Sequence, residues 1–215
     1  MYLAGIVILA AGITMNTKTM LGISPVISVA YAVSELTGIR LGIVTFFYYN
    51  LLILVQFLLL GREFDHFQWL QIAASFLTSG CISLYDMLLP VPASLPGRAV
   101  LLLAAIVVTG IGAILTIGAR IVPNPADGAA NAIAVRTGLS LGLSKNILDL
   151  SCVMIALVLG LVFRGRVIGI GVGTAAAMLL TGRVIALLQR PLMKLTGLDR
   201  ASADAPPEER PDGEK

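Results

Sequence analysis

Long apolar runs alternate with short polar breaks along almost the whole chain. Six such runs cover residues 2–20, 39–60, 68–90, 98–120, 142–163 and 167–189. A helix that crosses the hydrocarbon core of a bilayer, about 30 Å thick, needs roughly 20 apolar residues. The pattern therefore predicts an all-α protein, folded as a polytopic transmembrane bundle of six long helices.

Two shorter apolar elements, at residues 25–36 and 125–136, interrupt this series. Each is too short to cross a bilayer upright. Their boundaries are typical of helices, because a favoured N-cap and a proline precede the element and a glycine follows it. These signals are Ser24-Pro25 with Gly38 in the first element, and Asn124-Pro125 with Gly138 in the second. We expect two short or re-entrant helices.

The two halves of the chain repeat each other at an offset of 100 residues. The matched positions are Ser24-Pro25 with Asn124-Pro125, Thr37-Gly38 with Thr137-Gly138, and Leu41-Gly42 with Leu141-Gly142. We therefore predict two internal repeats, each with three long helices and one short or re-entrant helix. The first membrane repeat would cover residues 1–90 and the second 98–198, with a linker at 91–97. Re-entrant short helices would make the repeats inverted, whereas crossing ones would make them parallel.

Composition agrees with a chain that resides in lipid. Of its residues 57% are hydrophobic and 13% are charged, and its mean hydropathy is +0.93. Soluble domains carry about 25% charged residues. The net charge is +3 and no basic stripe with interleaved aromatic residues occurs, so nucleic acid is not an expected partner. The expected partner is the lipid bilayer.

The ends of the chain predict a topology. The N-terminus has no basic segment before its first apolar run, so we interpret that run as a helix and not as a cleaved signal. An even number of spans places both termini on one side. Arg190, Lys194 and Arg200 favour the cytoplasm for that side. We expect a multi-pass protein of the plasma membrane or inner membrane, with a disordered cytoplasmic tail at 199–215.

Several short motifs resemble the YczE/YitT-like family of bacterial multi-pass membrane proteins. They are Gly22-Ile23-Ser24-Pro25, Leu36-Thr37-Gly38, Leu70-Gln71-Ile72, Tyr85-Asp86, Arg136-Thr137-Gly138-Leu139-Ser140-Leu141-Gly142 and Gly169-Ile170-Gly171-Val172-Gly173-Thr174. Family members tend to place an acidic residue soon after the glycine of the third span. Here Cys81-Ile82-Ser83 follows Gly80, and the nearest carboxylate is Asp86. The resemblance implies a membrane protein, with transport as the activity to test.

Asp149 is the foremost candidate for a functional residue, because it lies about two helical turns into an apolar run. An unpaired charge at that depth costs roughly 2.5 kcal/mol or more, and intramembrane carboxylates are by default functional. With a one-residue slip after Gly142, Asp149 matches Asn50 in the other half. The alternative is that Lys145, four residues earlier on the same face, simply neutralises it.

The starts of the two short helices form a second candidate site. Free N–H groups and the positive end of the helix dipole at Ser24 and Asn124 can hold an anion or a carboxylate. Gln71 could orient a bound solute through hydrogen bonds. Asp127, in the first turn of the second element, could instead occupy the dipole itself. Ordinary capping of two structural helices is the alternative interpretation.

Two further carboxylates are candidates for coupling to a proton or cation. Asp86 lies near the end of the run 68–90, and Glu35 ends the first short element. Either side chain could equally be wet, at the membrane surface.

Glycine and alanine recur every four residues along one face of the last predicted span, at Gly165, Gly169, Gly173 and Ala177. Small residues at this spacing let helices approach closely. They predict packing within the bundle or between two protomers, which makes a homodimer an expected assembly.

No pattern of residues predicts catalysis, a metal site or a cofactor. His66 is the only histidine and lies in a polar loop, and Cys81 and Cys152 are expected to be buried free thiols. The leading hypothesis is a transporter or exporter of a small polar or charged solute, with proton coupling through Asp149. The alternatives are a membrane protein that organises or regulates partners, and a solute-binding subunit of a larger transport complex.

Overall fold

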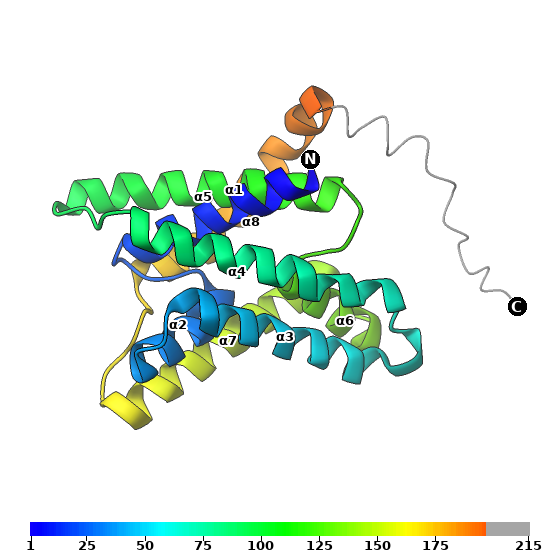
Figure 1. Cartoon of the computed structure of the whole chain (residues 1–215), viewed down its shortest axis with the longest axis horizontal. Coiled ribbons are helices and arrows are strands. Elements are labelled where there is room, and N and C mark those ends of the chain that lie inside the picture. Colours follow the sequence, from blue (N-terminus) through cyan, green and yellow to red (C-terminus); the bar gives the residue numbers. More distant parts are fainter. Residues whose placement is uncertain (197–215) are drawn as a thin grey trace, which may run out of the picture.

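The computed structural model describes residues 1–196, with side chains through residue 193; the predicted tail at 199–215 lies outside this part of the chain. The described residues form helices and no strand. In chain order they are α1 Tyr2–Lys18, α2 Pro25–Thr37, α3 Leu41–Leu60, α4 Gln71–Leu88, α5 Leu95–Gly118, α6 Pro125–Thr137, α7 Leu141–Arg164 and α8 Val172–Thr196 (Figure 1). Two short 3₁₀ turns, η1 Gly61–Glu63 and η2 His66–Leu70, join α3 to α4.

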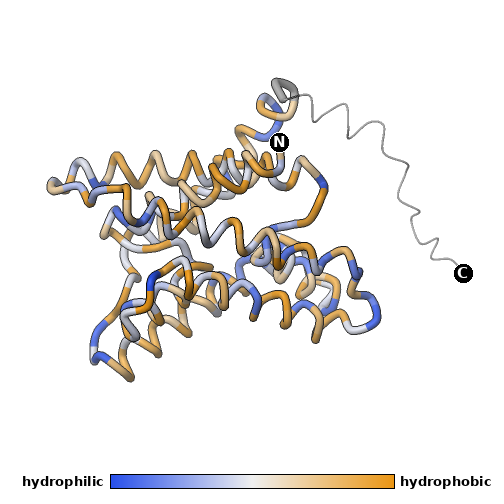
Figure 2. The backbone as a smooth tube through the Cα atoms, viewed as in Figure 1, coloured by the Kyte–Doolittle hydropathy of each residue, from blue (hydrophilic) through white to orange (hydrophobic). Residues whose placement is uncertain are grey.

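Four of these helices are long and apolar enough to cross a membrane. The spans are Leu41–Glu63, Leu95–Gly118, Leu141–Arg164 and Val172–Met193. Helix α1 is a shorter apolar helix of 17 residues, which corresponds to a length of about 26 Å. Apolar residues line the helices, and most polar residues gather at their ends (Figure 2). The chain is therefore an α-helical membrane protein.

The short helices have the boundaries that their cap signals predict. Gly38 and Gly138 adopt left-handed φ values of 73° and 71°, a conformation that side chains with a Cβ adopt at a cost, and both helices end there. Pro25 and Pro125 occupy the first turn.

Three predicted helix starts are wrong. Helix α4 begins at Gln71 and not at 68, because His66–Leu70 forms the turn η2. Helix α5 begins at Leu95 and not at 98, because the Ser94 hydroxyl accepts a hydrogen bond from Gly97 N and Pro96 fits the first turn, so the linker between the halves is shorter. The last helix begins at Val172 and not at 167. Gly165 ends α7 instead, with φ 64°, and Gly169 lies in the connecting loop. The four small residues therefore share no helix face.

The centre of the bundle is an antiparallel crossing of α1 and α5. A Cβ on Gly12 would collide with Thr109, and one on Gly112 would collide with Leu9. Residues with higher numbers on α1 thus contact residues with lower numbers on α5, so the two helices are antiparallel. Their backbones touch where both helices carry glycine. Figure 1 shows the two helices running in opposite directions.

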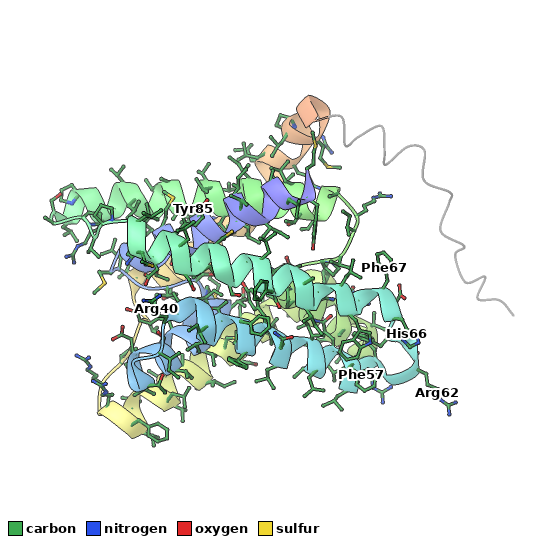
Figure 3. The ribbon with its side chains drawn as sticks, viewed as in Figure 1. Arg40, Phe57, Arg62, His66, Phe67 and Tyr85 are labelled. Atoms are coloured by element: carbon green, nitrogen blue, oxygen red, sulfur yellow. The ribbon has the colours of Figure 1, made fainter. Side chains whose placement is uncertain are left out.

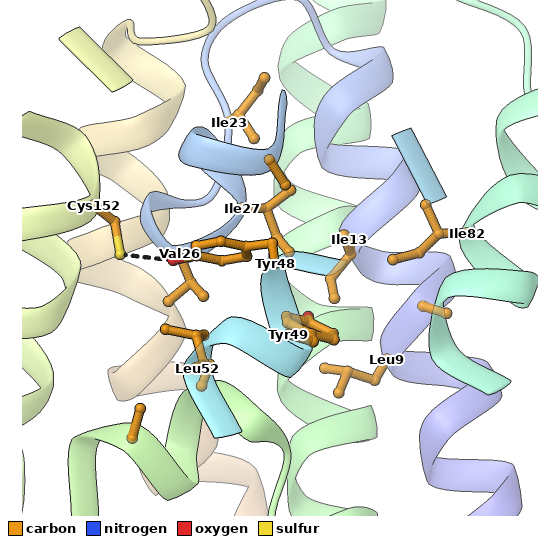
Figure 4. Close-up of a cluster of buried hydrophobic side chains, with 14 of the residues drawn as sticks. Leu9, Ile13, Ile23, Val26, Ile27, Tyr48, Tyr49, Leu52, Ile82 and Cys152 are labelled. Atoms are coloured by element: carbon orange, nitrogen blue, oxygen red, sulfur yellow. Dashed lines mark hydrogen bonds between the residues drawn. The ribbon is translucent and has the colours of Figure 1, made fainter. Parts of the chain in front are cut away.

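The other helices surround this pair. The short helices α2 and α6 each contact both α3 and α7. Helix α4 packs on α1 and α3, whereas α8 packs on α5 with little contact to α7. The side chains buried among α1, α2, α3, α6 and α7 form most of the core, in which the Tyr48 hydroxyl lies 3.1 Å from Cys152 Sγ (Figure 4). Both cysteines are free, as predicted, but Cys81 is only partly buried.

The α3–α4 connection is not a fully solvated loop. Phe64 is buried and packs edge-on against Phe57 and Trp69, with ring centroids 5.6 and 5.3 Å apart. His66 is exposed, in keeping with a solvated histidine. Arg62 and His66 lie at one end of the bundle and Arg40 lies toward the other (Figure 3).

Candidate functional site

A small cavity separates the starts of the two short helices. It measures about 100 Å³, and both Ser24 and Asn124 line it. Its walls include Leu9, in the middle of α1, and Thr109, well inside α5. The short helices therefore begin deep within the bundle and not at its ends. We call this space the central cavity.

The short helices leave the centre toward opposite ends of the molecule. Arg164, at the end of α7, donates a hydrogen bond of 3.1 Å to the Glu35 carbonyl near the end of α2. Helix α6 ends just before Leu141, where α7 begins. Because α7 is about 36 Å long, the ends of α2 and α6 are far apart.

The two helix starts differ in how their N–H groups are satisfied. Asn124 caps α6, because its Oδ1 accepts a hydrogen bond of 3.0 Å from Ala126 N. Ser24 occupies the same position on α2, but its side chain makes no capping hydrogen bond. Its own N–H donates to Asn16 Oδ1 at 2.9 Å. Among the described residues, the Val26 N–H finds no acceptor, so the start of α2 has a free donor.

Asp149 lines a second, larger cavity of about 320 Å³ between the start of α2 and helices α7 and α8. Asp149 is only 7% exposed, and its Oδ1 has no hydrogen-bond partner in the described structure. Ser24, Val26 and Thr181 line both this Asp149 cavity and the central cavity. The two spaces therefore adjoin, and the free end of α2 and an unpartnered carboxylate face the same volume.

Lys145 does not form an ion pair with Asp149. Its Nζ lies 3.5 Å from Asp127 Oδ1 instead, and it lines both cavities. No close ion pair therefore links the two residues, although the charge of Lys145 still acts on Asp149 at longer range. Asp127, in turn, contacts Lys145 as well as lying in the first turn of α6.

Asn50 lies apart from this site. Its Nδ2 donates to the Phe46 carbonyl at 2.7 Å and to Ser75 Oγ at 3.4 Å, so it faces α4. The one-residue slip that matched it to Asp149 has no basis in the helix boundaries, because α3 and α7 start at residues 41 and 141. At the offset of 100, the fully buried Tyr49 corresponds to Asp149, and Tyr49 lines the central cavity.

Gln71 supports the second short helix and does not line either cavity. Its side-chain amide exchanges hydrogen bonds of 3.0 and 3.1 Å with Gln56, and Gln56 Nε2 also donates to the Pro125 carbonyl at 3.1 Å. All three groups are buried. Sequence reasoning missed Gln56, although an amide near the end of the apolar run 39–60 was a visible signal.

Asp86 and Glu35 line a third cavity, of about 480 Å³, at the end of the bundle where α1, α2 and α4 finish. Lys18 Nζ lies 2.7 Å from Asp86 Oδ1, and the Asp86 side chain is 40% exposed. Arg40 also lines this end cavity. The two carboxylates thus belong to a charged opening that is separate from the Asp149 cavity.

The described residues bring no three His, Cys, Asp or Glu side chains together in an arrangement that could hold a metal ion. The site is instead a pair of adjoining cavities with one buried carboxylate, one lysine, hydroxyl groups and a free backbone donor.

Fold and site together define a helical membrane protein with two adjoining cavities, which apolar side chains and a few polar groups line. Residues 1–190 match a protein family described as a family of unknown function (DUF6198), and the chain belongs to that family. No curated protein and no solved structure matches the chain. The resemblance to YczE/YitT-like proteins stays a prediction.

Proposed function

We propose that this protein transports or exports a small polar or charged solute across the plasma membrane or inner membrane. The proposal depends above all on Asp149, a buried carboxylate whose Oδ1 has no partner and which lines a cavity large enough for a solute. A buried charge without a partner is costly. A cationic group on a bound solute would relieve that cost.

We also propose that the chain contains two inverted repeats. The antiparallel contact of α1 with α5 pairs Gly12 with Thr109 and Gly112 with Leu9, which are equivalent at the offset of 100. The contacts of α2 with α7 and of α3 with α6 are likewise equivalent. Inverted repeats of this kind place a solute site near the middle of the membrane, at their interface. An even number of spans keeps both termini on one side, which we assign to the cytoplasm.

A difference between the halves suggests how the site opens. Gly42 packs so closely that a Cβ there would collide with Ser83, whereas nothing lies within 4 Å of the same position on Gly142. Helix α4 is thus closed on α3, and the gap between α7 and α8 leaves the Asp149 cavity open. In our proposal the second state reverses these contacts, so that the site faces the other side of the membrane.

Asp149 also provides a means of proton coupling. When the solute leaves, a proton can neutralise the carboxylate and allow the empty site to change state. Lys145 and Asp127 are the charged groups nearest to it. Asp86 and Glu35, in the end cavity, would then be in the path of the solute and not in its binding site.

A membrane protein that organises partners is the second candidate. Helix α8 favours it, because its apolar stretch is the least buried of the four spans and presents a broad surface to lipid or to a second protein, including a second copy of this chain. A solute-binding subunit of a larger complex is the third candidate. Both differ from a transporter in that the purified chain alone would move no solute.

Stopped-flow light scattering tests the proposal. Liposomes that contain only the purified chain are mixed with hyperosmotic solutions of small zwitterions, amines and carboxylates, with and without a pH gradient. At least one solute should enter, and re-swell the vesicles, at least tenfold faster than in protein-free liposomes. Asp149→Asn should remove this acceleration and any effect of the gradient. Glu63→Gln, in the exposed α3–α4 connection, is the matched control and should behave as wild type. Entry no faster than in empty liposomes for every solute would overturn transport.

A further inference from the structure

If the site transports a solute, its chemistry also restricts what that solute is. We propose that the Asp149 cavity binds a small zwitterion of the amino-acid type, in which an ammonium group and a carboxylate are separated by one carbon atom. This inference rests on the proposed function and adds the class of ligand.

The negative end of the site is Asp149. The carboxylate is buried, and the Oδ1 atom has no hydrogen-bond donor in the described structure. Lys145, the nearest cation on the same helix, is directed to Asp127. An ammonium group would supply both the positive charge and the N–H donors that this oxygen lacks.

The positive end of the site is the start of α2. The Val26 N–H is free, and the Ser24 hydroxyl makes no capping hydrogen bond. Backbone donors at the N-terminus of a helix, together with its dipole, favour a carboxylate. Both residues line the same cavity as Asp149. The start of α6 has no such free donor, because the corresponding N–H group, that of Ala126, already donates a hydrogen bond to Asn124 Oδ1.

A ligand with a single charge satisfies only one end. A simple amine would pair with Asp149 but would leave the Val26 N–H without an acceptor and would face the positive end of α2. A simple carboxylate would use that N–H but would lie close to an unpaired Asp149. A zwitterion satisfies both ends, because each of its two charged groups then finds a partner in the cavity that offsets the cost of taking it out of water.

The available volume favours a small ligand. Binding cavities for small molecules range from about 300 to 1,000 Å³, and the Asp149 cavity, at about 320 Å³, lies at the low end. Apolar side chains, Met178 and Ile185 among them, line part of its wall and would accept a short aliphatic side chain.

Thermal unfolding of the purified full-length chain in detergent tests the class of ligand with three matched probes. L-Alanine carries both charges, propionate lacks the ammonium group, and ethylamine lacks the carboxylate. We expect L-alanine to raise the unfolding temperature, with an apparent affinity at least tenfold higher than that of either single-charge probe. Asp149→Asn should weaken the response to L-alanine at least tenfold, and Glu63→Gln should leave it unchanged.

A second variant separates binding from folding. Ser24→Asn places at the start of α2 the residue that caps α6, so its side chain should occupy the Val26 N–H. We expect this variant to unfold at the same temperature as wild type or higher, yet to bind L-alanine several-fold more weakly. Unchanged affinity in Ser24→Asn would contradict the assignment of the carboxylate to α2.

The remaining outcomes are equally decisive. A response to propionate or ethylamine equal to that of L-alanine would overturn the zwitterion, as would a lack of response to L-alanine. None of these results would by itself remove transport, which the vesicle assay reports for all three classes of solute. If vesicle entry fails as well, the proposed function fails.

Discussion

At the scale of single residues, most buried polar groups of the described structure support the fold, whereas Thr45 Oγ1, Ser144 Oγ and Asp149 Oδ1 have no hydrogen-bond partner there. Gln56, Gln71 and Asn124 each find a partner, and their positions follow from the need to satisfy buried hydrogen-bonding groups. Asp149 has no such partner for its Oδ1. Its apolar sequence neighbours made it recognisable in advance. Its surroundings could not be derived, because they come from α2 and α8, which lie far away in the chain.

The amide pair of Gln56 and Gln71 gives the residue-scale prediction. Gln56→Ala removes the Gln56 partner of the buried Gln71 amide, which keeps only a 3.4 Å hydrogen bond to Gln68 Oε1, and leaves the Pro125 carbonyl without the Gln56 donor. An unsatisfied buried polar group costs about 1–3 kcal/mol, so we expect the variant to lose at least about 2 kcal/mol of stability. Thermal unfolding in detergent measures this loss. Gln68→Ala removes only the longer, partly buried 3.4 Å hydrogen bond to Gln71 Nε2, so it should change stability by less than about 1 kcal/mol. Equal effects of the two variants would refute a structural role for the pair.

At the scale of elements, the local signals located the helices well. Caps, prolines and glycines gave the bounds of α2 and α6 to within one residue, because each acts through its own backbone. The start of α8 was predicted too early. Glycines at 165 and 169 suit a close helix contact as well as a left-handed turn, and only the packed structure selects the turn. The free N–H of α2 was also beyond prediction, since Ser24 is a favoured cap that here does not cap.

The α1–α5 crossing gives the element-scale prediction. Gly12→Val would place a branched side chain against the backbone of Thr109, and overpacking of this kind costs about 1–3 kcal/mol or more. We expect a lower unfolding temperature and loss of solute entry. Gly80→Ala is the control, because no atom lies within 4 Å of its added Cβ. It should be neutral or stabilising, by up to about 1 kcal/mol. A Gly12→Val protein as stable as wild type would contradict the close approach of α1 and α5.

At the scale of the whole molecule, the arrangement of the helices indicates how the two halves that repeat in the sequence are oriented relative to each other. The offset of 100 residues predicted two related halves but left their relative direction open. The antiparallel meeting of α1 and α5 favours inverted halves, and the short helices then begin near the centre and leave in opposite directions. The unequal spacing of α3–α4 and α7–α8 suggests that one side of the cavity is open. No local pattern in the sequence distinguishes these helix pairs.

The most direct test of this account is thiol labelling at the opening, in protein reconstituted in liposomes and with Cys81→Ala and Cys152→Ser in the background. Thr181→Cys lines the Asp149 cavity and should react rapidly with a hydrophilic maleimide. Ser75→Cys, fully buried where α4 contacts α3 through Asn50, should react slowly. A solute that enters the vesicles should slow labelling of Thr181→Cys at least threefold, and should not do so when Asp149→Asn is also present. Rapid labelling at both positions, or no protection by an entering solute, would contradict a solute site between α2, α7 and α8.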